Sequence, residues 1–275
     1  MDEVTAEYPA GLLMPAAELR VRVISNVACK TDLGRVRENN EDKFEFFIPG
    51  DDALLAARGQ IFVVCDGMGG HAAGQIASEL AAKTFIDVYL RHPSADAAEA
   101  ARAAIAAANR FVLDVSRVVP GRRGMGTTLT ALMLVQDQVL VANVGDSRAY
   151  RLRDGALEML TWDHTLVEEL VRGGMLTREA AEHHPQKHVL TRAIGVEDTL
   201  IPTVEWHDLA VGDCFLLCSD GLSNHVSDER IAEELAGPGL SQAVWNLIAA
   251  AMLDGGTDNC TALAIRVDAL QPVSG

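Results

Sequence analysis

Short apolar runs separated by polar turns dominate the chain, and one of them ends directly in an acidic residue. Residues 61–65 (IFVVC) have the length and composition of a buried strand. Asp66 follows at once, glycines fill three of the next four positions, and residues 72–90 carry a helical pattern. The sequence therefore predicts a strand, a tight turn and a helix in immediate succession.

Further strands are predicted from similar apolar or alternating runs. Asp154 and Gly155 separate two of these runs and form a strong hairpin-turn signal. Connections as short as this one join antiparallel neighbours. The other predicted strands cover residues 19–27, 43–48, 127–135, 138–144, 148–153, 156–160, 201–206, 211–219 and 260–267.

A second helix is predicted to follow the first, with Ser94 as its N-cap and with Pro120 and Gly121 after its end. Apolar residues recur in it at spacings of four and three, which gives one face suited to lie on a sheet. That face comprises Ala97, Ala101, Ala104, Ala108, Phe111 and Val115.

The remaining segments complete a layered fold. Helices are predicted at about residues 228–235 and 241–253, and residues 50–59 are predicted to be a loop with an acidic pair. Residues 163–195 have no strand pattern and indicate an insertion of short helical pieces. Residues 1–18 are predicted to be a flexible tail or, alternatively, an added edge segment. Antiparallel strands with paired helices favour an α+β fold that has sheets in the middle and helices outside.

Composition and charge narrow the class of protein. A chain of 275 residues that is 49% hydrophobic can bury a full core. The formal net charge of −16 argues against nucleic acid or an anionic membrane surface as a partner. The charge fits a protein that gathers carboxylates around cations, although an ordinary acidic protein would show it too. The start of the chain has no basic region typical of a secretory signal, and no apolar stretch approaches the roughly 20 residues of a spanning helix.

Five cysteines form no CxxC pair. An odd number without metal-type spacing indicates reduced thiols in a cytoplasmic protein. Cys65, Cys214 and Cys218 lie in apolar runs, where cysteine behaves as a small hydrophobic residue.

The turn after residues 61–65 offers oxygen ligands. A carboxylate at the end of a buried strand is costly unless a cation meets it, and Gly67 lets its backbone approach a ligand closely. Asp66 and the carbonyl of Gly67 therefore suit a hard metal such as Mg²⁺ or Mn²⁺. The alternative is a strand–turn–helix corner in which the aspartate only caps the helix.

Four other acidic segments lie at the ends of predicted strands. Clustered carboxylates repel one another unless cations sit among them, so a fold that gathers them would hold two or three Mg²⁺ or Mn²⁺ ions through oxygen and water. Zinc is disfavoured because the segments offer neither a cysteine pair nor a histidine pair. The segments are RENNED (37–42), VANVGDSR (141–148), FLLCSDG (215–221) and GGTDN (255–259).

Eight motifs in a fixed order resemble one known family. They are RENNED, CDGMGGH, GMGTTLTAL, NVGDSRAYRLR, DHT, LTRAIG, CSDGL and GGTDN. The set resembles the bacterial branch of the metal-dependent protein phosphatases, the PPM or protein phosphatase 2C type, over roughly residues 20–268. The resemblance implies a four-layer α-β-β-α sandwich, with two antiparallel sheets flanked by helices. It implies one catalytic domain over residues 19–270 with a flap insertion at about 163–195.

The resemblance also implies a centre of two Mg²⁺ or Mn²⁺ ions. Asp66 would bridge both ions, and Asp220 and Asp258 match the other carboxylates of the first. Glu41 and the carbonyl of Gly67 match the shell of the second ion.

Three further roles are implied in the same way. Asp42 would support water bound to the metals, and Asp146 would share a third, weaker ion with Asp220. Arg37 stands five residues before Asp42, where the family has its phosphate-binding arginine. Its planar fork matches two phosphate oxygens.

The implied reaction is the hydrolysis of phosphoserine and phosphothreonine in proteins, opposing a serine/threonine kinase. Water between two divalent ions loses a proton readily and attacks phosphorus in line with the departing oxygen. Met68 stands where the animal branch has a histidine. His71 is a candidate acid or phosphate contact, but capping or packing at the helix start is the favoured interpretation.

Basic side chains in the flap either contact an acidic phosphoprotein or balance neighbouring glutamates. Three flap histidines have no paired ligand spacing and are interpreted as a solvated segment. Two arginines in a glycine-rich loop are a further candidate contact. The basic flap side chains are Arg172, Arg178, Lys187 and Arg192, and the flap histidines are His183, His184 and His188. The two loop arginines are Arg122 and Arg123.

Two other functions compete with the phosphatase hypothesis. A catalytically weak, regulatory phosphoprotein-binding module would have lost metal carboxylates, whereas all of them are present here. A hydrolase for small phosphoesters would not need the open, loop-bordered site that the family implies. The favoured hypothesis is a cytoplasmic, monomeric enzyme that acts on phosphorylated proteins and binds neither nucleic acid nor membrane.

Overall fold

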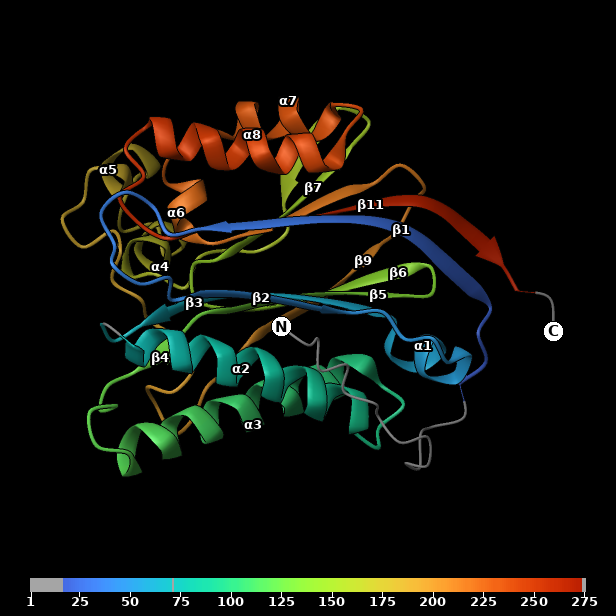
Figure 1. Ribbon diagram of the computed structural model, residues 1–275, viewed down its shortest axis with the longest axis horizontal. Helices are drawn as coiled ribbons and strands as arrows, with labels where there is room; N and C mark the ends of the chain where they lie inside the picture. The colour runs from blue at the N-terminus through green and yellow to red at the C-terminus, as the bar shows by residue number, and fades with distance from the viewer. Residues whose placement is uncertain (1–16, 71, 274–275) are drawn as a thin grey trace.

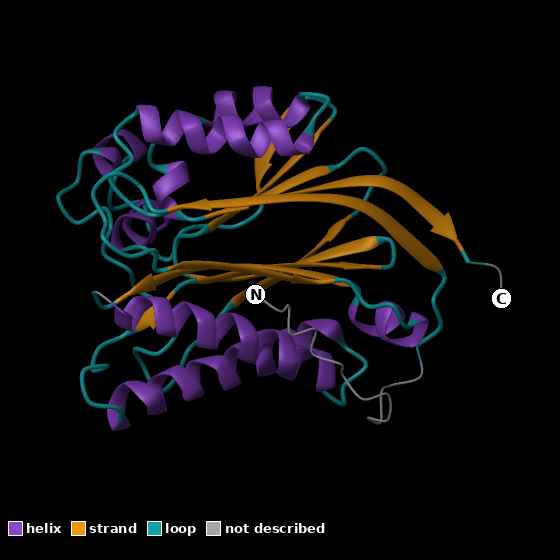
Figure 2. Ribbon diagram, viewed as in Figure 1, coloured by secondary structure: helices purple, strands orange, loops and turns teal. Residues whose placement is uncertain are grey.

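The computed structural model describes residues 17–70 and 72–273 (Figure 1). Two antiparallel sheets pack face to face, and helices cover the outer face of each sheet (Figure 2). This arrangement confirms the predicted α-β-β-α sandwich. Nearly all of the predicted tail, residues 1–18, lies outside the described residues, and so does His71.

Each sheet is built only from antiparallel pairs. The first has the order β1-β11-β10-β7-β8, and the second has the order β2-β3-β5-β6-β9 with the short β4 beside β3. The strands are β1 (Val21–Asp32), β2 (Asp42–Phe47), β3 (Gln60–Met68), β4 (Gly126–Thr127), β5 (Leu129–Val135), β6 (Gln138–Val144), β7 (Arg148–Arg153), β8 (Ala156–Met159), β9 (Thr203–Asp208), β10 (Cys214–Cys218) and β11 (Cys260–Pro272).

The unbroken apolar run of β3 reflects burial on both faces of its sheet. Ile61, Val63 and Cys65 belong to the core between this sheet and its helices. Phe62 and Val64 belong to the core between the two sheets. Side chains alternate along a strand, so a strand covered on both faces needs apolar residues at every position.

The helices pack in two layers. α2 and α3 cover the second sheet, while α7 and α8 cover the first (Figure 1). α4, α5 and α6 lie together at one end of the sandwich. The helices are α1 (Asp52–Arg58), α2 (Ala72–Arg91), α3 (Ala97–Val118), α4 (Leu166–Arg172), α5 (Arg178–Glu182), α6 (Asp220–Ser223), α7 (Asp228–Ala236) and α8 (Leu240–Leu253).

The prediction of a loop at residues 50–59 is wrong, because α1 occupies most of it. Its acidic pair has local roles: the side chain of Asp51 accepts a hydrogen bond from the backbone N–H of Leu54 (2.9 Å), and Asp52 pairs with Arg22 (2.6 Å). A helix of two turns is too short to show a reliable period in the sequence.

The start and the face of α3 also differ from the prediction. Its N-cap is Asp96, which accepts a hydrogen bond from the backbone N–H of Ala98 (2.8 Å), whereas Ser94 bonds a glutamate of the helix. Phe111 is 46% exposed, and the adjacent Val112 is fully buried instead. The buried face is therefore turned by one residue near the end of the helix.

Other predicted features are confirmed. Asp154 and Gly155 have positive φ angles of 50° and 81°, as a two-residue hairpin turn of type I′ requires. All five cysteines are free thiols, and only Cys29 among them is not fully buried. Within residues 17–70 and 72–273, no helix combines the length and apolar character that a bilayer-spanning segment requires.

The topology brings the acidic segments to one end of the sandwich. β3, β6 and β10 finish at this end, and β2 and β11 begin there (Figure 1). The loops that follow or precede these strands carry the predicted site residues. The fold thus collects side chains that are up to 221 residues apart in the sequence.

Candidate active site

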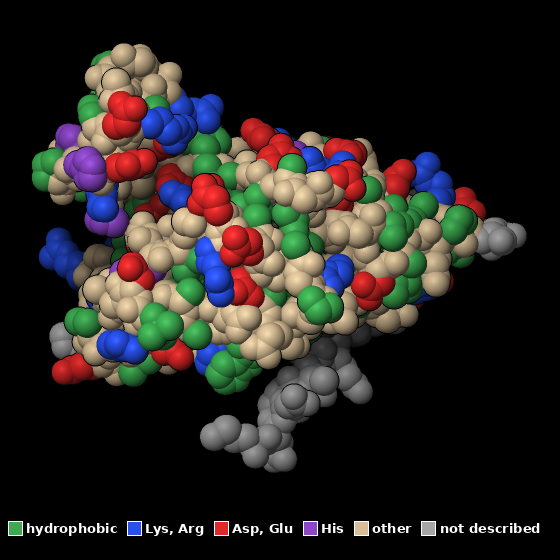
Figure 3. Space-filling view, turned by 90° about the horizontal axis from the view of Figure 1, so that it is seen from above, with side chains coloured by type: hydrophobic (Ala, Val, Ile, Leu, Met, Phe, Trp, Pro, Cys, Tyr) green, Lys and Arg blue, Asp and Glu red, His purple; other side chains and the backbone are tan. Residues whose placement is uncertain are grey.

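A cavity of about 700 Å³ opens at this end of the sandwich. In the view of Figure 3, a lobe with histidine and basic side chains overhangs a hollow in which acidic side chains are visible. Asp42, the one predicted site residue that does not line the cavity, lies behind it, opposite Asp66 in the β2–β3 ladder. The predicted site residues that line the cavity are Arg37, Glu41, Asp66, Gly67, Asp146, Asp220 and Asp258.

Asp66 is held by the last residue of β4 and by the residue that links β4 to β5. Its backbone N–H donates to the hydroxyl of Thr128 (2.8 Å), and its carbonyl accepts from the hydroxyl of Thr127 (2.8 Å). Burial raises the pKa of the Asp66 carboxyl well above its ordinary value, and the nearby carboxylates of Asp42 and Asp220 raise it further. A cation at this position would relieve both effects.

Glu41 and Gly67 touch through their backbones. The N–H of Gly67 donates to the carbonyl of Glu41 (3.2 Å), which also accepts from the hydroxyl of Ser78 (2.6 Å). A Cβ on Gly67 would lie 2.2 Å from the carbonyl oxygen of Gly74, and a Cβ on Gly74 would lie 1.9 Å from Oε2 of Glu41. Both glycines are therefore needed for this close approach.

Gly74 was not predicted from the sequence as a site residue. Its signal is its place inside the first turns of α2, where glycine is unfavourable relative to alanine by about 1 kcal/mol. The space it leaves is taken by the carboxylate of Glu41.

Asp42 is a buried carboxylate with one unsatisfied oxygen. Its Oδ2 accepts a hydrogen bond from the hydroxyl of Ser219 (2.7 Å), while its Oδ1 has no hydrogen-bond partner among the residues that the structure describes. Burial raises the pKa of Asp42 to about 7, although the bond from Ser219 opposes the shift. An orphaned carboxylate oxygen in a buried site is expected to meet water or a cation.

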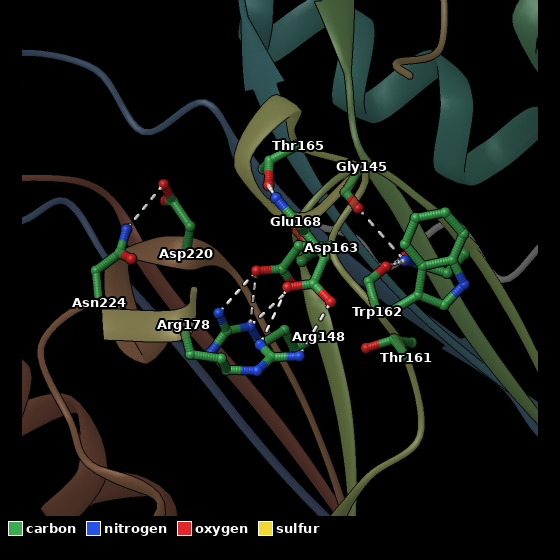
Figure 4. A network of polar contacts seen from close by, with 12 residues as sticks. Gly145, Arg148, Thr161, Trp162, Asp163, Thr165, Glu168, Arg178, Asp220 and Asn224 are labelled. Carbon is green, nitrogen blue, oxygen red and sulfur yellow. Dashed lines mark hydrogen bonds and ion pairs between the residues drawn. The ribbon is translucent and has the colours of Figure 1, made fainter. Parts of the chain in front are cut away.

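Asp220 follows β10 of the first sheet, and Asp146 lies in the connection between β6 of the second sheet and β7 of the first. Asp220 begins α6, and its Oδ2 accepts from Asn224 (3.1 Å), whereas its Oδ1 is buried without a partner (Figure 4). Burial raises the pKa of Asp220, and the Asp258 carboxylate raises it further. Burial, followed by the charge of Asp220, raises the pKa of Asp146 to about 8.

An arginine fork supports the loop that carries Asp146. Arg148 donates from Nε and from its terminal nitrogen to the two oxygens of Asp163 (2.9 and 2.7 Å). Beside it, Arg178 of the flap meets Glu168 of α4 (3.0 and 3.2 Å) (Figure 4). These bidentate pairs fix the base of the flap next to Asp146.

Arg37 and Asp258 form an ion pair across the cavity edge. A guanidinium nitrogen of Arg37 lies 2.6 Å from Oδ2 of Asp258, and the Arg37 side chain is about half exposed. The hydrogen bond to Asp258 raises the pKa of Arg37. A guanidinium has five N–H donors, so this bond leaves donors for an oxyanion.

Asn259 joins the loop of Arg37 to the loop of Asp258. Its buried side chain accepts from the backbone N–H of Glu41 (2.8 Å) and donates to the carbonyls of Leu33 (2.8 Å) and Asn39 (3.0 Å). Asn259 belongs to the GGTDN motif, which does not by itself predict this positioning role. The only sequence signal is an asparagine directly before a buried strand.

Most flap cations are engaged within the protein. The guanidinium groups of Arg172 and Arg192 lie over the ring of Trp162, at 4.3 and 4.9 Å from its centre, and Arg192 is 3.9 Å from Glu169. With the Arg178 pair, this favours the interpretation that flap arginines balance neighbouring groups. Lys187 has no ion pair with any residue that the structure describes. His188 lines the cavity, whereas His183, His184, Arg122 and Arg123 do not.

His164 of the DHT motif is a buried, neutral link between the flap and the Asp146 loop. Its Nδ1 accepts from the backbone N–H of Gly145 (3.1 Å), and its Nε2 lies 3.0 Å from the hydroxyl of Thr203. Burial lowers the pKa of His164 to about 3, and the positive charges of Arg192 and Arg172 lower it further. The imidazole therefore stays uncharged at neutral pH.

This low pKa predicts an acid-sensitive stability. The unfolded chain binds a proton at His164 below its ordinary pKa of about 6.5, whereas the folded chain does not until about pH 3. Stability is therefore complete above pH 6.5 and is lost as the pH falls. We expect the free energy of unfolding of a His164→Gln variant to fall less steeply, by about 1.4 kcal/mol per pH unit below pH 6. Urea unfolding across this range measures the slopes, and parallel slopes would contradict the assignment.

The donor set fits hard divalent cations. All the acidic groups offer oxygen, and no cysteine lines the cavity. The unsatisfied Oδ1 atoms of Asp42 and Asp220 are buried positions that a cation or its water would complete. In the described side-chain positions, no three such groups converge closely enough to hold an ion as they stand. The fit therefore rests on ligand chemistry, burial and the two orphaned oxygens.

Comparison with known families identifies the family to which this chain belongs. The family model described as "Protein phosphatase 2C" matches residues 38–252, which is most of the chain. The chain belongs to the protein phosphatase 2C family. The match includes the segments that carry Glu41, Asp66, Asp146 and Asp220.

Bacterial relatives of this phosphatase domain agree in sequence. The serine/threonine protein phosphatase PstP of Mycobacterium tuberculosis is 38% identical over 248 residues, which are 90% of this chain and 46% of PstP. The serine/threonine phosphatase stp of Listeria monocytogenes is 38% identical over 247 residues, 88% of this chain and 96% of that protein. The chain thus carries a serine/threonine protein phosphatase domain and spans less than half of PstP.

Solved structures agree in fold. A serine/threonine phosphatase of S. agalactiae superposes with a TM-score of 0.81 at 35% identity, covering 89% of this chain and all of that one. The catalytic domain of PstP in complex with two manganese ions superposes with a TM-score of 0.76 at 36% identity. The superposition covers 90% of this chain and 99% of that one. A relative that was solved with two manganese ions therefore shares this sandwich.

Proposed function

We propose that the chain hydrolyses phosphoserine and phosphothreonine in proteins, using two Mg²⁺ or Mn²⁺ ions and, more weakly, a third. The main support is the gathering of four half-buried aspartates and one buried glutamate around one cavity, with the buried Asp42 behind them and a half-exposed arginine beside them. Carboxylates in this number are stable together only with cations among them. The catalytic domain is proposed to cover residues 19–270, with the flap at about 163–195.

We assign the ligands by chemistry and position. Asp66, whose carboxyl has the other aspartates as charged neighbours, would be shared by two ions. Asp220 and Asp258 would complete the first ion, and Glu41 with the carbonyl of Gly67 would complete the second. Asp146 beside Asp220 would hold the third ion.

The chain's own groups then position the reactants. Lewis acidity, which eases the deprotonation of water and offsets phosphoryl charge, is the chemistry that the bound cations would supply. Arg37 binds the phosphoryl oxygens through its guanidinium and orients the phosphorus toward the carboxylate cluster. Asp42 uses its free Oδ1 to accept a hydrogen bond from water and is itself held by Ser219. No nucleophilic side chain is required, which suits a cavity without cysteine.

The biological setting follows from this chemistry. The substrates would be phosphorylated proteins, and a serine/threonine kinase would supply them. We further propose that the chain acts as a monomer in the cytoplasm.

Phosphate release from a phosphothreonine peptide tests the function. The rate is measured with Mn²⁺, with Mg²⁺ and with EDTA. Release that depends on added metal supports the enzyme. A folded protein that releases no phosphate with either metal but binds the phosphopeptide would instead establish a binding module.

Arg37→Ala is expected to raise KM about tenfold while changing kcat little, because it removes a charged phosphate contact worth about 1.5 kcal/mol. Metal affinity should stay the same or increase, since Asp258 loses a competing cation. Steady-state kinetics and metal titration measure the two effects. Arg122→Ala, which removes an arginine outside the cavity, is the matched control. An unchanged KM for Arg37→Ala would remove its assigned role.

A further inference from the structure

The cavity is larger than a phosphoryl group requires. Its volume of about 700 Å³ lies in the range of sites that enclose ligands of drug size. The carboxylates and Arg37 occupy one part of its lining. Most of the rest of the lining is formed by the end of the flap, by the segment that leads from the flap to β9, and by the end of β3 with the turn that follows it. This second part has different chemistry.

Five apolar side chains lie among polar ones in the second part of the cavity, and we call them the apolar groove. Val196 is 50% exposed and Ile201 is 72% exposed, although both are large and hydrophobic. Single exposed apolar residues are ordinary, but these share one cavity with three others. Contiguous exposed apolar surface in a cavity is typical of a binding site. The apolar groove consists of Met68, Leu190, Val196, Leu200 and Ile201.

A buried asparagine of α3 holds the wall that carries Val196. The side chain of Asn109 accepts from the backbone N–H of Gly195 (2.7 Å) and donates to the carbonyl of Glu197 (2.8 Å). Asn109 is only 3% exposed. A polar side chain buried in a helix thus clamps the residues on both sides of Val196.

Two arginines hold the rest of this wall. Arg117 of α3 forms two hydrogen bonds with the carboxylate of Asp198, each 2.9 Å long. Arg192 donates to the carbonyl of Ile201 (3.4 Å) while its guanidinium rests on Trp162. The wall is therefore shaped before a ligand arrives, and a preformed site binds at a lower entropic cost.

We propose that the apolar groove binds an apolar side chain that neighbours the phosphorylated residue in the substrate protein. This inference rests on the proposed function. A phosphoresidue seated at Arg37 brings its chain neighbours along, because consecutive Cα atoms are only 3.8 Å apart. The groove is continuous with the phosphate site, so the occupant is a segment of the same substrate chain. The enzyme then prefers phosphoproteins with an apolar residue close to the phosphoresidue.

Paired peptides test the preference. Both contain phosphothreonine; one has leucine moved in turn through the neighbouring positions, and the other has glycine there. We expect kcat/KM to be about tenfold higher for the best leucine peptide, since filling a hydrophobic pocket typically gives 10- to 200-fold discrimination. Val196→Asp and Ile201→Asp should reduce this ratio to about one without changing the rate on the glycine peptide. Thermal unfolding confirms that these surface variants are folded.

Val211→Asp is the matched control, because Val211 is 59% exposed in the turn before β10 and lies outside the cavity. It should leave the ratio unchanged. Equal kcat/KM for all peptides, or a ratio that survives both groove substitutions, would overturn the groove while leaving the phosphatase intact. No hydrolysis of either peptide would overturn the proposed function and the groove with it.

Discussion

Asp66→Asn is expected to lower kcat on a phosphothreonine peptide by about 10³-fold or more while leaving the fold intact. The substitution keeps the shape of the side chain but removes the charge that two cations would share. Metal ions contribute several kcal/mol of charge stabilisation to such reactions, and a loss of about 4 kcal/mol corresponds to 10³-fold in rate. Steady-state kinetics with Mn²⁺ and metal titration by calorimetry measure the loss.

Stability separates this effect from unfolding. Without metal, the Asp66→Asn variant should melt at the same temperature as the parent or higher, because one charge leaves a cluster of carboxylates. Asp268→Asn, on the exposed side of β11, is the matched control and should change neither property. Full activity in the Asp66→Asn variant would refute the two-metal assignment.

Asn259→Ala is expected to destabilise the protein by about 2–4 kcal/mol, because one buried and two part-buried backbone groups lose their partner and a buried one costs about 1–3 kcal/mol. The loop that carries Arg37 and Glu41 would also loosen, so metal affinity falls and KM rises. Denaturant unfolding and metal titration measure the two losses.

Two further variants test this positioning role. Asn259→Asp keeps the acceptor for the Glu41 N–H but turns an oxygen toward the two carbonyls and adds a charge beside the other carboxylates, so it should destabilise the protein at least as much as Asn259→Ala. Asn39→Ala, which removes an exposed side chain from the same loop, should change stability by less than about 0.5 kcal/mol. If Asn259→Ala unfolded like Asn39→Ala, the loop would have to be held by other contacts.

The residues proposed to hold the metals could be found in the sequence because their motifs are local. Asp66 follows a run in which every residue from 61 to 65 is apolar. A buried strand that ends in aspartate can therefore be recognised without a structure. The contacts that position these residues are between distant segments. The approach of Gly74 to Glu41 and the three bonds of Asn259 depend on how loops pack, and no local pattern encodes them.

The fold was predictable to the same depth. Strands buried on both faces and the Asp154–Gly155 turn were found because their signals are strong. The wrong predictions concern places where two local structures fit the sequence about equally well. Ser94 and Asp96 are both good N-caps, and only the path of the chain into α3 selects Asp96. α1 is two turns long, so its apolar residues resembled an ordinary loop.

The carboxylates of the cavity belong to both layers of the sandwich. Asp42 and Asp66 lie on strands of the second sheet, whereas Asp220 and Asp258 adjoin β10 and β11 of the first. A cation held among them would cross-link the two sheets at this end. Chelation would then open the sandwich from that end, with faster amide exchange near the site and little change at the far end of β1 and β11. Catalytic activity and the packing of the two sheets at this end would thus depend on the same ions.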